Sequence, residues 1–212
     1  MKIKIVTLFP KMFESPFAES ILKRAIGNKI IEIEIINLRD YANDSYKTVD
    51  DKPFGGGVGM LLKVDVVARC LEKINGHKIL MSARGKRFKQ EKAEELAKYE
   101  ELVFVCGHYE GVDQRIADNL VDEEISIGDF VTTGGELPTM TIVDSIVRLL
   151  PGVLGKDKSS NEESFSKKLN RKIEYPQYTR PAEYKGWKVP EVLMSGDPKK
   201  IKEWQLEQQK GQ

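Results

Sequence analysis

The sequence has few cysteines, few histidines and no long apolar run. Its two cysteines, Cys70 and Cys106, and its two histidines follow no spacing typical of a zinc site. Both cysteines stand in apolar segments, which favours buried reduced thiols over a disulfide. No apolar run reaches the roughly 18 residues of a membrane span, and the N-terminal MKIKIVTLFP is too short and too alternating for a signal peptide. We therefore expect a cytoplasmic protein with no membrane partner and no structural zinc.

Two phosphate-binding motifs are also missing. A P-loop would end in Gly-Lys-Ser/Thr, and a dinucleotide fingerprint would place G-x-G-x-x-G after the first strand. The first predicted strand instead runs into Leu8-Phe9-Pro10. The sequence thus gives no support to a P-loop nucleotidase or to an N-terminal dinucleotide-binding unit.

The composition is that of a folded chain with an uneven distribution of charge. Of the 212 residues, 40% are apolar and 32% are charged, with a net charge of +1. Residues 156–212 carry an excess of Lys and Arg, whereas residues 1–155 carry an excess of Asp and Glu. This asymmetry is compatible with a C-terminal part that faces a polyanion such as nucleic acid, or with an ordinary solvated surface.

Apolar periodicity predicts strands that alternate with helices. Alternating or continuous apolar residues predict strands at 2–9, 31–35, 78–81, 102–106, 125–127 and 130–131. Helical spacing predicts helices at 15–26, 65–74 (with Asp65 as its cap), 88–99, 112–120, 138–150 and 198–209. The pattern indicates an α/β fold with a largely parallel sheet. Residues 156–172 are polar and predict a flexible connection, and several prolines favour irregular chain up to the last helix.

Glycines and carboxylates gather after two of the predicted strands. The segments LVFVCGHYEGVD and ISIGDFVTTGGELP contain five glycines, together with Tyr109, Glu110 and Asp129, and no lysine. Glycine lets the backbone approach a ligand closely because it has no Cβ. This composition favours a site for a small ligand other than a bare phosphate. Ordinary tight turns are the alternative.

Two other features have more than one interpretation. The glycine-rich segment 48–60, in which Asp50, Asp51 and Lys52 precede the glycines, suits either a mobile linker or a lid that closes on a ligand or a splayed base. His108 could be an acid–base group or a surface histidine.

Charged residues near the C-terminal part are equally open to interpretation. Arg148, on an apolar helix, could form an ion pair with Asp144 or point into a site. Glu162 and Glu163 lie in a polar segment and, by pattern alone, are solvated charges.

Several segments together resemble one enzyme family. LFPKMF, KTVDDKPFGGGVGM, CGHYEGVDQR, SIGDFVTTGGELP, MTIVDSIVRLLPGVLG and YPQYTRP are similar to the bacterial tRNA (guanine-37-N1)-methyltransferases of the trefoil-knotted SPOUT superfamily. The resemblance runs from Met1 to about Gln209. It implies a parallel sheet with a deep C-terminal knot, which pattern reasoning alone would exclude because knots are rare. The implied organisation is a knotted cofactor-binding domain at 1–155, a flexible linker at 156–175 and the start of a truncated helical tRNA-binding domain at 176–212.

The resemblance implies S-adenosylmethionine as methyl donor, held by three knot loops at 80–85, 106–111 and 126–138. The cofactor-binding residues implied are Leu80, Ser82, Gly107, Tyr109, Glu110, Gly111, Ser126, Ile127, Gly128, Asp129, Phe130, Val131, Thr132, Gly134, Gly135 and Pro138. Backbone groups of these loops would bind the adenine, and Glu110 would favour the cationic cofactor.

The resemblance also assigns the substrate and the chemistry. The implied substrate is tRNA with guanine at position 37, bound by a homodimer that shares its active site. The substrate-binding residues implied are Asp50, Gly55, Gly57, Gly59, Arg115 and Arg180. Glu163 takes the position of the general base and Arg148 that of the group that stabilises guanine O6. Magnesium ion is associated with turnover in the family. It is therefore a further expectation for this chain, with no metal ligands assigned.

The chain departs from the family at a few positions. The family commonly has Asp where this chain has Glu163, so Glu162 stays a rival for the base. Ala83 and Val58 replace prolines that are usual in the first knot loop and in the glycine-rich lid. The chain ends at Gln212, near the start of the family's C-terminal domain, so weak RNA binding is expected. A knotted methyltransferase of another RNA specificity and a non-catalytic RNA-binding protein are the alternative functions.

Overall fold

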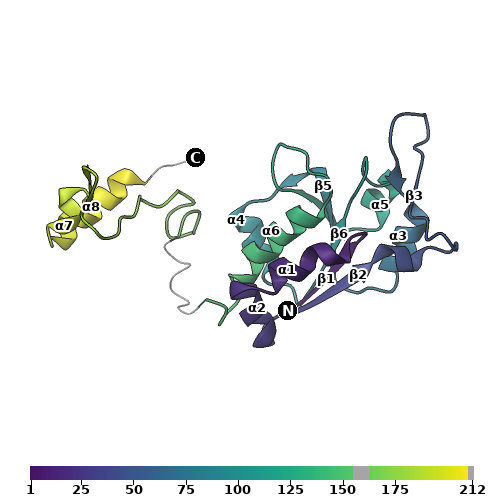
Figure 1. Ribbon diagram of the computed structural model, residues 1–212, viewed down its shortest axis with the longest axis horizontal. Coiled ribbons are helices and arrows are strands. Elements are labelled where there is room, and N and C mark those ends of the chain that lie inside the picture. The colour runs from purple at the N-terminus through teal and green to yellow at the C-terminus, as the bar shows by residue number, and fades with distance from the viewer. Residues whose placement is uncertain (155–162, 210–212) are drawn as a thin grey trace. The chain divides into compact units, whose positions relative to one another are not determined.

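The computed structural model describes residues 1–154 and 163–209 (Figure 1). The chain divides into two compact units, Met1–Gly155 and Lys156–Gln212. Glu162, the rival for the base, lies outside the described residues.

A parallel sheet of five strands forms the centre of the first unit. The strands are β1 (Lys2–Thr7), β2 (Glu32–Asn37), β5 (His77–Arg87), β6 (Glu101–Cys106) and β7 (Glu123–Ser126), in the order β2-β1-β6-β5-β7. Every pair in this sheet is parallel. Strands β1 and β6 are buried along almost their whole length, as expected where helices cover both faces of a parallel sheet. The predicted α/β class with a parallel sheet is confirmed.

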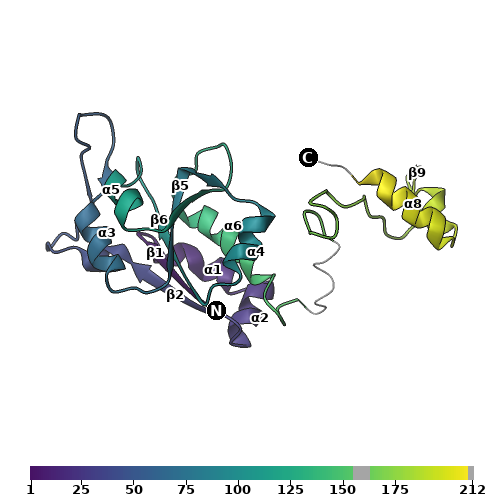
Figure 2. The same cartoon turned by 180° about the vertical axis from the view of Figure 1, so that it is seen from behind.

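Helices cover both faces of this sheet (Figures 1 and 2). The helices of one face are α1 (Glu14–Phe17), α2 (Ser20–Gly27), α4 (Gln90–Leu96) and α6 (Glu136–Val147). The elements of the other face are η2 (Leu38–Tyr41), α3 (Val64–Leu71) and α5 (Gln114–Asn119). Each face has its own apolar core: Phe104 lies in the first and Val105 in the second. Successive strand side chains point to opposite faces, and this alternation produces the two cores.

Strand β5 folds around the end of β7. Ile125 of β7 pairs with both Met81 and Lys86 of β5, so residues 82–85 bulge out of the ladder between these two partners. Gly85 lies so close that an added Cβ would sit 2.5 Å from the carbonyl carbon of Glu124. Because only glycine fits there, the sequence GK at 85–86 allows the chain to turn around its neighbour.

The remaining elements of the first unit are short. They are η1 (Pro10–Phe13) and an antiparallel pair, β3 (Asp50–Asp51) and β4 (Leu61–Leu62), which closes the glycine-rich segment 52–60 into a hairpin-like loop.

Several sequence predictions of local structure were wrong in detail. The expected helix 15–26 is interrupted between α1 and α2, where Ser20 adopts a positive φ of 53°. Residues 130–131 lie in a loop rather than a strand. Asp65 does not cap α3: the N-cap residue is Lys63, and the Asp65 carboxylate pairs with Arg69 at 3.0 Å.

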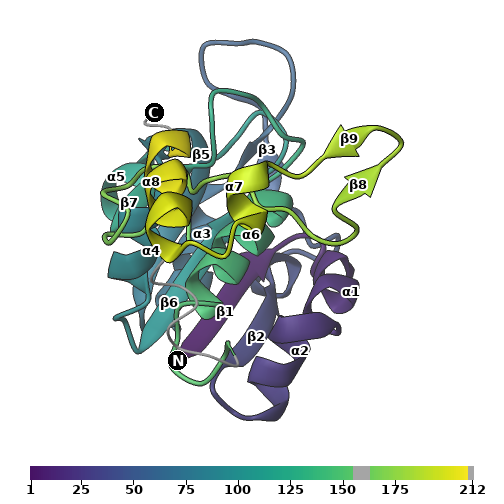
Figure 3. The same cartoon turned by 90° about the vertical axis from the view of Figure 1, so that its left-hand side faces the viewer.

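The second unit contains a hairpin and two helices. These are β8 (Glu183–Tyr184), β9 (Trp187–Lys188), α7 (Glu191–Met194) and α8 (Pro198–Gln208), visible in Figure 3. The proline-rich stretch was expected to be irregular, so the hairpin is a correction. Asp197 caps α8 by accepting hydrogen bonds from the backbone of Lys199 and Lys200.

Two further sequence predictions concern the cysteine thiols and membrane-spanning helices. Cys70 and Cys106 are both buried free thiols, which confirms the prediction. None of the helices in the described part of the chain is both long enough and apolar enough to cross a bilayer.

Candidate functional site

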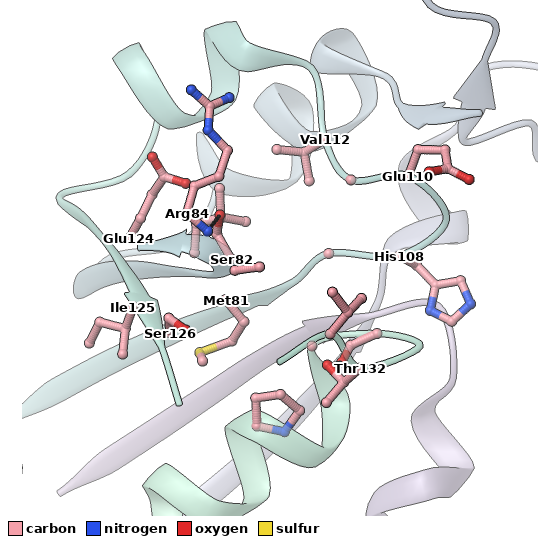
Figure 4. A pocket seen from close by; sticks show the side chains of 18 of the residues that line it. Met81, Ser82, Arg84, His108, Glu110, Val112, Glu124, Ile125, Ser126 and Thr132 are labelled. Atoms are coloured by element: carbon pink, nitrogen blue, oxygen red, sulfur yellow. Dashed lines mark hydrogen bonds between the residues drawn. The ribbon is translucent and has the colours of Figure 1, made fainter. Parts of the chain in front are cut away.

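A cavity of about 430 Å³ lies where β5, β6 and β7 end. Its walls come from the bulge 82–85 of β5, the loop 107–112 after β6 and the loop 126–135 between β7 and α6. Figure 4 shows side chains from all three segments around it. Loops at the carboxyl ends of parallel strands are the usual place for ligands in α/β sheets. The volume suits a small organic molecule.

The structure brings most of the predicted cofactor-binding residues together in this cavity. All of the predicted set lines it except Gly128 and Asp129. Those two shape the loop instead: the N–H of Gly128 donates to Ser126 Oγ at 3.2 Å, and Asp129 pairs with Arg87 at 2.9 Å. Glycine loops separated in sequence thus become neighbouring walls of one site.

The walls meet through backbone contacts that exclude larger residues. The Gly135 N–H donates to the Gly107 carbonyl at 2.8 Å. An added Cβ on Gly135 would lie 2.8 Å from Cys106 Cα, and one on Gly107 would lie 3.3 Å from the Met81 carbonyl. The backbone at the floor of the cavity is therefore accessible to a ligand because these positions lack side chains.

His108 sits at one side of the cavity rather than on an open surface. Its ring packs against the ring of Phe9, with the two centroids 4.7 Å apart. Its Nδ1 is buried, has no hydrogen-bond partner among the described residues, and lies 3.8 Å from a carboxylate oxygen of Glu136. Glu136 is itself 1% exposed and accepts a hydrogen bond from Thr7 at 2.7 Å. The histidine of the loop after β6 and the buried carboxylate at the start of α6 therefore lie close together without a hydrogen bond between them.

Carboxylates dominate the charged lining. Glu110 and Glu124 are acidic lining residues, and Arg84 is basic. The guanidinium of Arg84 donates to Gln114 Oε1 at 2.8 Å, which links the bulge to α5. Sequence reasoning assigned no role to Arg84, Gln114 or Glu124, although Arg84 is a polar residue just after a predicted strand, the usual signal for such a site.

The glycine-rich segment 52–60 meets the cavity at Glu110. The Glu110 N–H donates to the Met60 carbonyl at 3.1 Å, and an added Cβ on Gly59 would collide with the Glu110 side chain. Gly59 has a φ of +87°, which favours glycine. Gly55 and Gly57 also have positive φ, and no residue between 50 and 60 lines the cavity.

The other predicted substrate residues of the first unit, Asp50 and Arg115, lie outside the cavity lining. Asp50 is half-buried in β3, and Arg180 is exposed in the second unit. Arg115 is exposed and pairs with Asp113 at 2.7 Å. Hydrogen bonds from Arg115 hold the pKa of the Asp113 carboxyl below its usual value, so this pair is ionised at neutral pH.

The two predicted catalytic residues belong to different units. Arg148 is the C-cap residue of α6, and its backbone N–H donates to the Asp144 carbonyl at 3.2 Å. Glu163 is half-buried at the start of the described part of the second unit, and its carbonyl accepts from the Ser166 N–H at 3.1 Å.

Within residues 1–154 and 163–209, no cluster of three or more His, Cys, Asp or Glu side chains is arranged to hold a metal ion. Burial raises the pKa of the Cys106 thiol, and the nearby Glu136 carboxylate raises it further, so Cys106 remains protonated.

Known proteins similar to this chain point to one activity. The family model described as tRNA (Guanine-1)-methyltransferase TrmD matches residues 1–212. A tRNA (guanine-N(1)-)-methyltransferase of Bacillus subtilis is 53% identical over 210 residues, covering 96% of this chain and 85% of the relative. Proteins of the same description from Syntrophomonas wolfei and Geobacter sulfurreducens are 54% and 49% identical, covering 98% and 96% of this chain and 85% and 84% of their own lengths.

Proposed function

The chain belongs to the tRNA (guanine-1)-methyltransferase family, and from this we propose that it transfers a methyl group from S-adenosylmethionine to N1 of guanine 37 in tRNA. The observation that supports the proposal is the cavity at the ends of β5, β6 and β7, lined by fourteen of the sixteen residues expected to bind the methyl donor, all but Gly128 and Asp129. Position 37 and the residue roles rest on the family resemblance.

The chemistry of the cavity fits S-adenosylmethionine. The bare backbone at Gly107 and Gly135 offers amide and carbonyl groups that suit the edge of a purine. Apolar side chains such as Leu80 and Ile127 suit its faces, and Glu110 and Glu124 suit its ammonium and sulfonium charges. When bound, this molecule supplies an electrophilic methyl group.

The protein must remove a proton and stabilise a negative charge. Guanine N1 carries a proton at neutral pH, so it is a poor nucleophile until a base accepts that proton. We assign this role to the carboxylate of Glu163. As N1 loses its proton, negative charge develops on O6, and the guanidinium of Arg148 stabilises it.

Hydrogen bonds close the loop that follows Glu163. Downstream of it, the Phe165 N–H donates to the Lys172 carbonyl at 2.8 Å and the Arg171 N–H to the Ser166 carbonyl at 3.0 Å. The Arg171 guanidinium donates to the Phe165 carbonyl at 2.8 Å. A loop closed by its own hydrogen bonds can present a carboxylate to a substrate at a modest entropic cost.

The substrate residues are assigned as follows. The segment 52–60 acts as a lid whose glycines, with Asp50, surround the guanine, while Arg115 and Arg180 contact the RNA backbone. Gly59 couples this lid to Glu110, because its backbone lies directly against that side chain. Closing the lid would thus move Glu110 and so change the lining of the methyl-donor site.

The finer architecture stays part of the proposal. We infer a trefoil knot in residues 80–138, supported by the way residues 82–85 pass around Ile125 of β7. The domain limits 1–155, 156–175 and 176–212, the homodimer with a shared active site and the cytoplasmic location stay predictions. Magnesium also stays a prediction, and in the absence of an acidic cluster among the described residues we would expect it to involve the RNA phosphates.

The proposal is tested with labelled S-adenosylmethionine and two unmodified tRNA transcripts that differ only in guanine or adenine at position 37. We expect label at N1 of guanine 37 in the first transcript and none in the second. Nucleoside mass spectrometry identifies the methylated position.

Other outcomes separate the alternative functions. Label at another base would indicate a methyltransferase of different RNA specificity. Binding of both the methyl donor and tRNA without any transfer would indicate a non-catalytic RNA-binding protein.

A further inference from the structure

The hairpin β8–β9 has a well-defined turn. Its two central residues, Lys185 and Gly186, have φ values of 51° and 83°. Positive φ at both positions is typical of a type I′ turn, which matches the twist of a two-stranded hairpin. The Val189 N–H donates to the Ala182 carbonyl at 2.9 Å and closes the hairpin at its base. Figure 3 shows it extending away from α7 and α8 of its own unit.

Two large aromatic side chains face solvent on this hairpin. Tyr184 and Trp187 are direct cross-strand partners, with ring centroids 5.9 Å apart. Tyr184 is 55% exposed and Trp187 is 72% exposed, and every residue from 181 to 188 is exposed. An isolated two-stranded hairpin is only marginally stable in water, and these rings bury little surface within it. Two adjacent exposed aromatic rings make this hairpin a candidate interaction surface.

The hairpin and the residues just before it carry an excess of positive charge. Lys185 places its ammonium 5.4 Å from the centre of the Tyr184 ring. Lys188, whose side chain is 73% exposed, is the cross-strand partner of Glu183, makes a long 3.8 Å ion pair with it, and so lies on the face of the hairpin opposite Trp187. Arg180 is exposed just before the hairpin. Three cations and one carboxylate in residues 180–188 favour a polyanion as the partner of this surface.

We propose that the hairpin is a stacking platform for unpaired nucleotides of tRNA. Trp187 and Tyr184 stack on splayed bases, and Lys185, whose ammonium lies near the Tyr184 ring, contacts a flanking phosphate. Aromatic rings stack on any base, so the platform supplies affinity for single-stranded loop nucleotides rather than base specificity. The inference rests on the proposed function, since that function makes tRNA the substrate.

Tryptophan fluorescence tests the proposal directly, because the chain has two tryptophans. In a Trp204→Phe variant, Trp187 is the sole tryptophan. We expect its emission to be quenched as an unmodified guanine-37 tRNA transcript is added. Emission that does not change at saturating RNA would overturn the proposal.

Affinity measurements give a second test in the otherwise wild-type chain. Trp187→Ala should weaken binding of the same transcript by roughly five- to hundredfold, the effect of losing one base–aromatic stack, whereas Trp187→Phe should retain most of the affinity. Lys185→Ala should lower the slope of log Kd against log salt concentration by about 0.7. Leu206→Ala is the matched control, because Leu206 is another large apolar residue of the same unit that is mostly exposed (55%, against 72% for Trp187). It should leave the affinity for tRNA unchanged.

The outcomes separate this inference from the proposed function. If Trp187→Ala binds tRNA as tightly as the wild type while wild-type chain methylates it, the hairpin proposal fails and the function stands. If the wild type binds tRNA through Trp187 but transfers no methyl group, the proposed function fails and the hairpin proposal stands. Trp187 emission that changes with protein concentration in the absence of RNA, and then no longer responds to RNA, would assign the hairpin to a protein contact and overturn the proposal.

Discussion

The Thr7 hydroxyl donates a hydrogen bond to the Glu136 carboxylate across 129 residues of sequence, at 2.7 Å. Both residues are 1% exposed. Thr7 Oγ1 also accepts from the Phe9 N–H at 2.9 Å. Glu136 lies in the first turn of α6, where the helix dipole favours a negative charge. The pair thus joins the end of β1 to the helix that follows the cavity loop 126–135.

Removing the Thr7 hydroxyl should destabilise the first unit. Thr7→Val keeps the shape of the side chain but leaves a buried carboxylate oxygen and the Phe9 N–H without this partner. We expect a loss of about 1–3 kcal/mol in the free energy of unfolding, measured by urea denaturation. Thr7→Ser retains the hydroxyl and should lose less; equal stability of Thr7→Val and wild type would contradict this account.

Adding a methyl group at Gly59 should weaken binding of the methyl donor. In a Gly59→Ala variant, the new Cβ would displace Glu110 from its place in the cavity lining. We expect this substitution to lower the affinity for S-adenosylmethionine by about tenfold, the effect of losing one charge-assisted hydrogen bond, measured by calorimetric titration.

Gly56→Ala is the matched control for that experiment. Gly56 has a φ of +81°, close to the +87° of Gly59, but an added Cβ there would meet nothing within 4 Å. Both substitutions therefore introduce similar backbone strain, and only one reaches Glu110. If the two variants bind the methyl donor equally well, the contact between Gly59 and Glu110 does not affect the cavity.

The parallel α/β fold could be predicted from sequence because its central strands are continuous apolar runs. The segment LVFVC became β6, buried at almost every position. The hairpin β8–β9 could not be predicted in this way, because strands of two exposed residues have no apolar face to create a pattern. The break between α1 and α2 could not be predicted for a different reason. The apolar spacing of the sequence continues through Ser20, and only the backbone conformation shows the interruption.

The candidate site was predicted by resemblance more than by pattern. Periodicity indicates that Gly107 and Gly135 follow strands but not that their backbones touch, since strand order in a parallel sheet is not encoded in apolar spacing. The lining residues Arg84 and Glu124 had no signal beyond their position near strand ends. They enter the cavity because β5 bulges around β7, a tertiary feature.

The ionisation of Glu123 should make the free energy of unfolding depend on pH in the acid range. Burial raises the pKa of Glu123, but hydrogen bonds from His77 at 2.7 Å and Lys92 at 3.0 Å outweigh burial and lower the pKa below its usual value. A carboxyl group whose pKa is lower in the folded than in the unfolded chain stabilises the folded state. This contribution is complete at pH values above the unfolded-state pKa of about 4.3, and it is lost as the pH falls through the folded-state pKa. We expect Glu123→Gln to cost about 1–3 kcal/mol at pH 7, with the difference from wild type shrinking below about pH 4.

Urea denaturation at pH 7, 5 and 3.5 measures this effect. Glu95→Gln is the control, because Glu95 also pairs with Lys92, at 2.9 Å, but its side chain is 52% exposed. It should lose little stability at any of these pH values. A difference between Glu123→Gln and wild type that persists unchanged at pH 3.5 would show that the charge of Glu123 is not its source.

The assigned catalytic roles predict a separation of chemistry from binding. Glu163→Gln removes the base and Arg148→Ala removes the positive charge assigned to O6, so both should reduce single-turnover methyl transfer at least a hundredfold. Arg148 does not line the cavity, and Glu163 is assigned to proton transfer rather than to cofactor binding, so affinity for S-adenosylmethionine should stay within about twofold of wild type. Rapid-quench transfer assays and calorimetric titration give the two quantities.

Conservative variants distinguish the base from its neighbours. Glu163→Asp retains a carboxylate and should recover much of the rate that Glu163→Gln loses. Glu162→Gln should transfer methyl groups at close to the wild-type rate. If Glu163→Gln keeps a near-normal single-turnover rate, the base must be sought at Glu162 or at Asp50, and the same assay on Glu162→Gln and Asp50→Asn identifies which carboxylate accepts the N1 proton.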